Sequence, residues 1–107
     1  MGKQSPVRIE PFDLADRAEE LTVRAQKMRR KGDLRRAVVT LREACALDEG
    51  DAARWVIYGD LLRRHGKRDE AAHAMKQALF LRERQGDKAK ANVIRKLILN
   101  LARPPAG

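Results

Sequence analysis

The chain has 107 residues, of which 36% are charged and 4% aromatic, and its formal net charge is +9 at pH 7. This length corresponds to a single domain with a core of moderate size. The shortage of aromatic residues argues against a β-sandwich, whereas abundant Ala, Leu, Arg and Glu favour helices. The charge says nothing about fold, but it suits nucleic acid, an anionic membrane surface or an acidic protein as partner. The other interpretation is a well-solvated helical surface that binds nothing through its charge.

The cysteine content and the hydropathy pattern bear on location. The single cysteine, Cys45, excludes an intrachain disulfide and fits a reducing compartment. No apolar run approaches the length of a membrane span, and the opening MGKQSPVRIEPFD lacks the apolar core of a secretory signal. We therefore expect a cytoplasmic protein.

The beginning of the chain differs in composition from the remainder. Residues 1–12 contain two prolines and no helical period, which predicts an extended N-terminal arm. A helical repeat domain is expected over 13–102, and a loose tail at 103–107. Asp13 is the expected N-cap of a first helix over 14–31. The apolar stripe of that helix consists of Leu14, Leu21, Ala25 and Met28.

Glycine and aspartate mark the next helix boundaries. Gly32 is expected to end the first helix in a left-handed conformation, and Asp33 to cap a second helix over 34–47. A turn this short makes the two helices antiparallel neighbours. Asp51 caps a third helix, which is expected over 52–65.

Glycine also marks the ends of the third and fourth helices, and aspartate the start of the fifth. Gly66 ends the third helix and precedes a fourth over 68–84, and Gly86 ends the fourth. Asp87 then caps a fifth helix that runs to about residue 101. Its apolar stripe has the i, i+3, i+4, i+7 spacing of a helix face and consists of Ile94, Leu97, Ile98 and Leu101.

The second half of the chain repeats the first at a spacing of 34 residues. The matching pairs are Ala25 with Gly59, Gly32 with Gly66, Ala37 with Ala71, Ala44 with Ala78 and Leu47 with Leu81. A helix pair that repeats at this period predicts an all-α solenoid of about five helices. Small residues recur where helices must approach closely. Because glycine inside a helix costs about 1 kcal/mol relative to alanine, we interpret Gly59 as a packing position.

This pattern resembles the tetratricopeptide repeat family. The second unit supplies Trp55, Tyr58, Gly59, Leu62, Gly66, Ala71, Met75, Ala78 and Leu81. The first supplies Leu21, Arg24, Ala25, Met28, Gly32, Ala37, Leu41, Ala44 and Leu47. The resemblance covers residues 18–84, and the fifth helix comes after it as a half-unit or cap at a spacing of about 36.

The resemblance implies a mostly non-catalytic scaffold whose first helices line a concave groove for a peptide or a helix of a partner. Carried over by helical position, the groove residues are Glu19, Thr22, Gln26, Arg29, Val56, Asp60, Arg63, Asn92 and Lys96. The Lys and Asn clamp with which some members bind chaperone tails is absent, because Thr22, Gln26, Ile57 and Asp60 stand at its positions.

The turn of each repeat is rich in cations. KMRRKGDLRR in the first unit matches LLRRHGKRDE in the second, and stacked units would place the two turns side by side. The expected basic edge consists of Arg29, Arg30, Lys31, Arg35, Arg36, Arg63, Arg64, Lys67 and Arg68. Such an edge attracts phosphates or an acidic segment. The alternative is that these cations only stabilise helix C-termini, worth about 0.3–1 kcal/mol each.

No pattern of catalytic or ligand-binding residues stands out. Trp55 and Tyr58 fall at helical spacing and are expected in the core. Phe80 lies off the main stripe of its helix, where it either packs on the fifth helix or is exposed. His65 and His73 lack partners at metal-ligand spacing, and Cys45 on an apolar face is expected to be inert. We predict no enzyme, no cofactor and no metal.

Two functions remain. The first is a protein-protein interaction adaptor that presents a short groove and a basic edge to a partner protein or an acidic peptide. The second is a non-specific binder of nucleic acid or an anionic surface through the basic edge. Ala89, Val93 and Leu99 lie off the main stripe of the fifth helix, so a homodimer through that helix is a further expectation.

Overall fold

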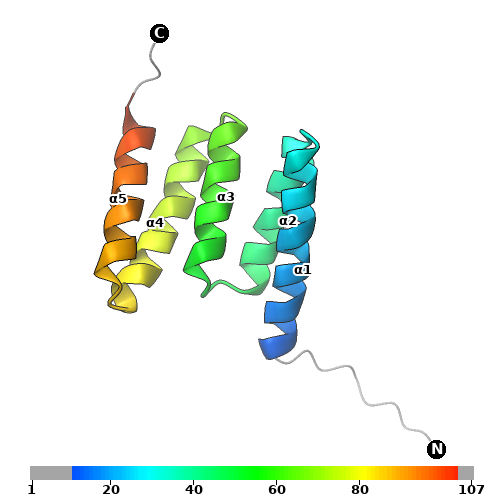
Figure 1. The fold of residues 1–107 in the computed structure, drawn as a ribbon, viewed down its shortest axis with the longest axis horizontal. Coiled ribbons are helices and arrows are strands. Elements are labelled where there is room, and N and C mark those ends of the chain that lie inside the picture. Colours follow the sequence, from blue (N-terminus) through cyan, green and yellow to red (C-terminus); the bar gives the residue numbers. More distant parts are fainter. Residues whose placement is uncertain (1–10, 104–107) are drawn as a thin grey trace, which may run out of the picture.

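The computed structural model describes residues 11–103, and no strand occurs in this range. It contains five helices: α1 (Pro11–Arg30), α2 (Leu34–Leu47), α3 (Ala52–Arg64), α4 (Arg68–Arg84) and α5 (Lys88–Ala102) (Figure 1). The prediction of an all-helical chain with five helices is confirmed. No helix in the described range is both long and apolar enough to cross a membrane.

Four of the five helices lie within one residue of their predicted bounds, and α1 is the exception. It begins at Pro11, three residues before the predicted start, so Asp13 lies in its first turn and is not its N-cap. The reason is local, because proline is well suited to the first turn of a helix, where its missing N–H is not needed, and an acid there stabilises the helix dipole. The predicted arm therefore loses its last two residues. Its other ten residues, and residues 104–107 of the predicted tail, lie outside the described range.

The turns use the predicted capping residues. The Asp33, Asp51 and Asp87 side chains accept hydrogen bonds from the backbone N–H groups three residues later, at 3.1–3.3 Å. Gly32 and Gly66 adopt φ values of +84° and +80°, which residues with a Cβ rarely adopt. In each of these two turns the residue after the glycine donates to a carbonyl five residues back, at 2.8–2.9 Å. The two turns are therefore local copies of one another.

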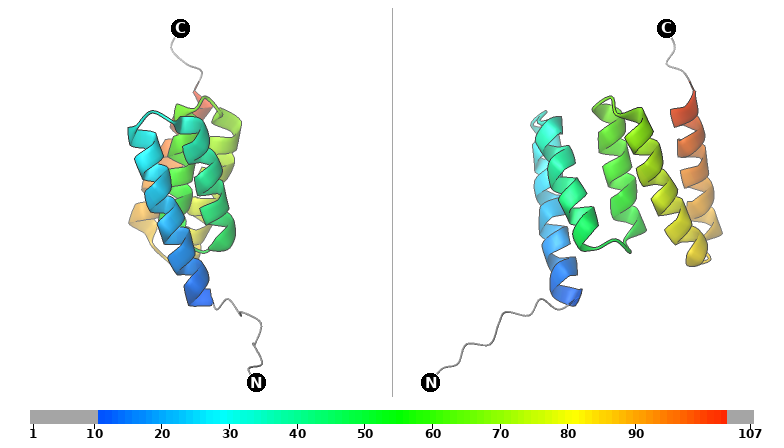
Figure 2. Two further views of the ribbon diagram at one scale, coloured as in Figure 1. Left: turned by 90° about the vertical axis from the view of Figure 1, so that its right-hand side faces the viewer. Right: turned by 180° about the vertical axis from the view of Figure 1, so that it is seen from behind.

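Consecutive helices run in opposite directions and form a row with α1 at one end and α5 at the other (Figures 1 and 2). The α1–α2 and α3–α4 turns lie at one edge of the row, and the α2–α3 and α4–α5 turns at the opposite edge (Figure 1). As a result α1, α3 and α5 point the same way.

Small residues fill the places where the helices approach most closely. Ala25, Ala37, Ala44, Ala71 and Ala78 have no exposed surface. Gly59 faces Met75 so closely that a Cβ on the glycine would lie 3.0 Å from the methionine Cε. The interpretation of Gly59 as a packing position is therefore confirmed. Leu41, Leu61 and Leu62 supply the largest buried aliphatic side chains, each worth about 1.5–3 kcal/mol of burial.

Candidate functional site

Three hollows run along the side of the molecule formed mainly by α1, α3 and α5. The first, of about 260 Å³, lies between α1 and α3, and the middle one, of about 270 Å³, between α3 and α5. They share Ala53 and Ile57. The third hollow, of about 310 Å³, shares Val56 and Leu97 with the middle one. We call this continuous surface the odd-helix face.

The middle hollow is the most apolar part of the odd-helix face. Its floor and walls consist of Ala53, Val56, Ile57, Val93, Ile94 and Leu97, with Arg82 and Lys90 at its edge. Val93 is 58% exposed, and Val56 and Ile57 are half-buried. Aliphatic groups that remain in contact with water in a concavity can take an apolar side chain from another molecule.

Two helical stripes face each other across this hollow. Ala53, Val56, Ile57 and Asp60 have the i, i+3, i+4, i+7 spacing on α3, and Lys90, Val93, Ile94 and Leu97 have it on α5. Of the residues that line the middle hollow, the predicted groove includes only Val56; it does not include Ala53, Ile57, Arg82, Lys90, Val93, Ile94 and Leu97. Periodicity alone would have found Ala53, because it lies one helical turn before Val56.

Six of the nine predicted groove residues line the odd-helix face. Glu19, Thr22 and Gln26 line the first hollow, and Val56, Asp60 and Arg63 line the third. The other three do not line it. Asn92 lies in a separate hollow with Gly86, Lys88 and Arg95, and Arg29 and Lys96 line none of these hollows. The α5 contribution comes from the stripe that faces α3, whereas Asn92 and Lys96 lie on the exposed side of α5.

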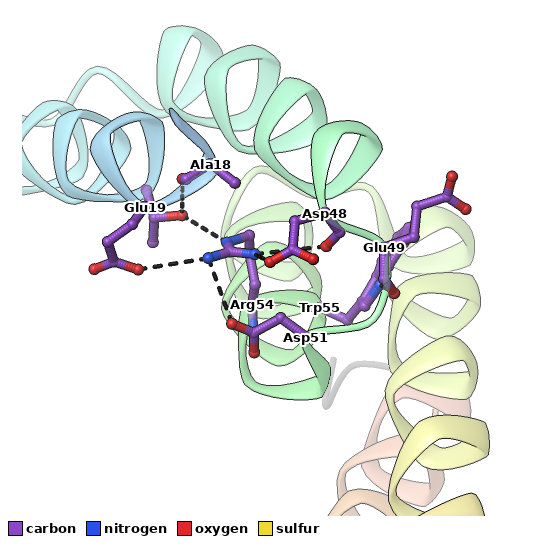
Figure 3. A network of polar contacts seen from close by, with 8 residues as sticks. Ala18, Glu19, Asp48, Glu49, Asp51, Arg54 and Trp55 are labelled. Atoms are coloured by element: carbon purple, nitrogen blue, oxygen red, sulfur yellow. Dashed lines mark hydrogen bonds and ion pairs between the residues drawn. The ribbon is translucent and has the colours of Figure 1, made fainter. Parts of the chain in front are cut away.

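A buried arginine is among the residues that line the first hollow, and it lies within a network of polar contacts (Figure 3). Arg54 is only 4% exposed, and its Nε donates to the Thr22 hydroxyl at 2.9 Å. Its Nη1 donates to Asp48 Oδ2 at 3.0 Å. Its Nη2 lies 3.4 Å from Asp51 Oδ2 and 3.5 Å from Glu19 Oε1. Arg54 therefore ties α3 to α1 and to the α2–α3 turn, and it is not among the residues that the sequence pattern predicts as functional.

Thr22 belongs to this network more than to the groove. Its hydroxyl donates to the Ala18 carbonyl at 2.7 Å while it accepts from Arg54, and the side chain is buried. Because the hydroxyl both donates and accepts inside the protein, it is engaged structurally, and Thr22 as a partner contact stays a prediction. Its place in the wall of the first hollow is structural.

The aromatic residues divide between core and surface. Tyr58 is buried, as predicted, and its hydroxyl accepts from Arg42 Nε at 3.0 Å. Trp55 is half-buried, packs at the edge of the core and donates from Nε1 to the Glu49 carbonyl at 2.8 Å (Figure 3). Phe80 is exposed, with the Arg84 guanidinium carbon 5.6 Å from its ring centroid. Of the two interpretations of Phe80, the structure therefore supports the exposed side chain.

The two turns that carry the basic edge lie at the same edge of the molecule (Figure 1). Several of its cations are already engaged. Arg63 and Arg64 both bind Asp60, at 2.7 and 2.8 Å. Burial alone would raise the pKa of the Asp60 carboxyl, but the hydrogen bonds from the two arginines outweigh it and hold that pKa below its usual range.

Arg68 has a structural role at the end of α5. Its Nη2 donates to the carbonyls of Asn100, Leu101 and Arg103, at 3.2, 2.7 and 2.7 Å. It therefore satisfies carbonyls that the helix end leaves open, so this guanidinium of the predicted basic edge is already engaged within the chain. Within residues 11–103, the edge cations without an ion pair or side-chain hydrogen bond are Arg30, Lys31, Arg35 and Lys67.

Cys45 is buried against the core. Burial raises the pKa of its thiol to about 12, and the thiolate is the reactive form. Among the described residues, no cluster of His, Cys, Asp and Glu is arranged to hold a metal ion.

We expect Cys45 to resist thiol reagents in the folded protein. At a pH of about 8 the thiolate fraction should be roughly 1,000-fold below that of a free cysteine, with labelling slowed at least as much. The measurement is the rate of reaction with Ellman's reagent with and without denaturing urea. Fast stoichiometric labelling without urea would contradict this burial.

Comparison with known proteins adds no assignment. No protein-family model matches the chain, and no curated protein was found that matches it. Function is therefore inferred from the geometry of the described residues.

Proposed function

We propose that this chain is a non-enzymatic adaptor whose odd-helix face holds a short segment of a partner protein. The observation that carries the proposal is the middle hollow, in which aliphatic residues of α3 and α5 face each other and remain open to water. A natural occupant is an aliphatic or aromatic side chain of an extended peptide or a single helix. Arg82 and Lys90 at the edge favour a segment with acidic groups beside that side chain.

A helix-pair solenoid of the tetratricopeptide type is part of the same proposal. Two features support it. The first is the 34-residue sequence repeat, and the second is that the two repeats have the same glycine turn, with matching hydrogen bonds at Asp33 and Lys67. In such an array the first helix of each unit lines one side, which agrees with hollows lined chiefly by α1, α3 and α5. With α5 as the last such helix in the described range, the groove holds only a short segment.

A peptide selection tests the adaptor function. Peptides selected from a random library should bind Val93→Arg at least tenfold more weakly than the original protein, because a charge would occupy the apolar hollow. Val39→Arg is the matched control, since Val39 lies on α2 and is 53% exposed against 58% for Val93. Both variants add the same charge.

Two outcomes would contradict the proposal. One is a set of selected peptides that bind Val93→Arg and Val39→Arg equally well. The other is binding of a random-sequence duplex that persists at physiological salt and is lost when Arg30, Lys31, Arg35 and Lys67 are changed to Glu. That result would favour the basic edge and nucleic acid, whose binding falls steeply with salt, whereas binding anchored in the apolar hollow should change little.

A further inference from the structure

The α1 end of the row carries three carboxylates beside an exposed valine. Two of them are paired within the chain, Glu20 with Arg17 at 3.3 Å and Glu19 with Arg54 at 3.5 Å. Asp16, Glu19, Glu20 and Val23 have the i, i+3, i+4, i+7 spacing and so share one side of α1. Together with Arg24 they line a shallow hollow of about 550 Å³. Val23 is exposed, and α1 is the last helix of the row at this end (Figure 1). Glu19 and Val23 also line the first hollow, so this surface adjoins the odd-helix face. We call this surface the acidic end.

The α5 end has the opposite charge. Between residues 88 and 102 the chain contains Lys88, Lys90, Arg95 and Lys96 and no Asp or Glu. Lys88, Asn92 and Lys96 succeed one another at four-residue spacing on the exposed side of α5, beside the exposed Leu99. Lys88 and Lys96 make no ion pair within residues 11–103. We call this surface the basic end.

These charges argue against a symmetric dimer. An α5-to-α5 contact would place lysine against lysine, and an α1-to-α1 contact would place carboxylate against carboxylate. Val93 does not support an α5-to-α5 contact either, because it lines the middle hollow, whereas Leu99 lies about 120° around the helix from it. The expected homodimer through Ala89, Val93 and Leu99 therefore lacks a single continuous apolar patch.

A head-to-tail contact brings opposite charges together. Helices α1 and α5 point the same way, and the start of α1 lies at the same edge of the row as the α4–α5 turn (Figure 1). A second copy shifted along the row would thus bring its Asp16 and Glu20 near Lys88 and Asn92 of the first. We propose that the chain associates with copies of itself in this way, the acidic end of one copy on the basic end of the next.

Such a contact is heterologous, and between copies related by a shift along the row it repeats from copy to copy as an open stack. Exposed charges are screened by salt. Association should therefore be weak, form short stacks at high concentration, and decline as salt rises. It uses the two ends of the row and leaves the middle hollow open.

Sedimentation velocity of the full chain tests this contact. The original protein should form dimers and larger species towards about 1 mM in low salt, and lose them at several-fold higher ionic strength. Two variants each reverse the charge of one surface in the proposed contact. D16K/E20K makes both ends basic, and K88E/K96E makes both ends acidic. Each variant alone should need at least about tenfold higher concentration to associate, because like charges then meet.

An equimolar mixture of the two variants is the most direct test of the head-to-tail contact. In the mixture every acidic end can meet a basic end again, so association should return to that of the original protein. E43K/E49K is the matched control, because it changes the net charge as much as D16K/E20K at exposed positions outside both ends, and it should associate like the original protein. Circular dichroism checks that each variant remains folded.

Three results would overturn the proposal. The first is an original protein that stays monomeric throughout the low-salt series. The second is a mixture that associates no better than its components. The third is K88E/K96E associating more strongly by itself than the original protein, which would identify an α5-to-α5 dimer that lysine repulsion had been holding apart.

Discussion

An Arg54→Ala variant is expected to lose about 3 kcal/mol of unfolding free energy, because removal of one partner of a buried charge network leaves the other groups unpaired. Arg54 is 4% exposed and its guanidinium contacts Thr22, Asp48, Asp51 and Glu19. We expect the low end of the range for a broken buried pair, since the three carboxylates are partly hydrated. In a domain of ordinary stability this is a large fraction of the total.

Urea unfolding monitored by circular dichroism measures the loss, with an unchanged m-value indicating that the unfolding transition is the same. Arg36→Ala is the control, because the Arg36 side chain is 75% exposed and its contact with Asp33 is 3.8 Å long; it should cost less than about 1 kcal/mol. Arg54→Lys should lie between the two, since an ammonium cannot reproduce the planar array of donors. A loss below about 1 kcal/mol for Arg54→Ala would mean that the network contributes little.

The helices could be predicted because their signals are local. Asp33, Asp51 and Asp87 each lie one residue before a helix that they cap, and the apolar period of about 3.6 residues fills the interval up to the next glycine. The start of α1 was missed because two prolines were interpreted as an extended arm, although the second of them lies where a helix accepts proline.

The site could be predicted only in part, because it depends on which sides of distant helices face each other. Val56 and Asp60 line the third hollow from α3, whereas the repeat offset used for α5 selects residues on the exposed side of that helix. Arg54 gave no local sign of burial. Its partners Thr22 and Glu19 lie 32 and 35 residues earlier in the chain, and only the packing of α3 against α1 brings them together.

The odd-helix face depends on how closely α3 and α4 pack. Met75 of α4 lies against Gly59 of α3, and it also lines the third hollow with Val56 and Leu97. A change at Gly59 is therefore expected to act both on stability and on the shape of the proposed binding face. This links the close helix contact to the function.

A Gly59→Leu variant is expected to lose about 3 kcal/mol of unfolding free energy, which is the upper end for an overpacked core. The reason is that even a Cβ at this position would lie 3.0–3.2 Å from three side-chain atoms of Met75. Gly59→Ala should stay within about 1 kcal/mol of the original, since methionine adapts its shape and alanine gains helix propensity over glycine. Gly50→Leu is the control, because nothing lies within 4 Å of a Cβ at Gly50. Urea unfolding of the three variants measures these differences.

The double variant G59L/M75A identifies the cause. If the leucine clashes with Met75, removal of the methionine side chain makes room for it, and the double variant should be more stable than the sum of the single changes by at least about 1 kcal/mol. If the two losses of unfolding free energy simply add, the leucine destabilises the protein through contacts other than the one with Met75. The same variant should recover peptide binding more fully than Gly59→Leu alone, because α3 and α4 could then return to the spacing that holds Val56 opposite Leu97. Recovery of stability without recovery of binding would separate the packing of α3 on α4 from the shape of the odd-helix face.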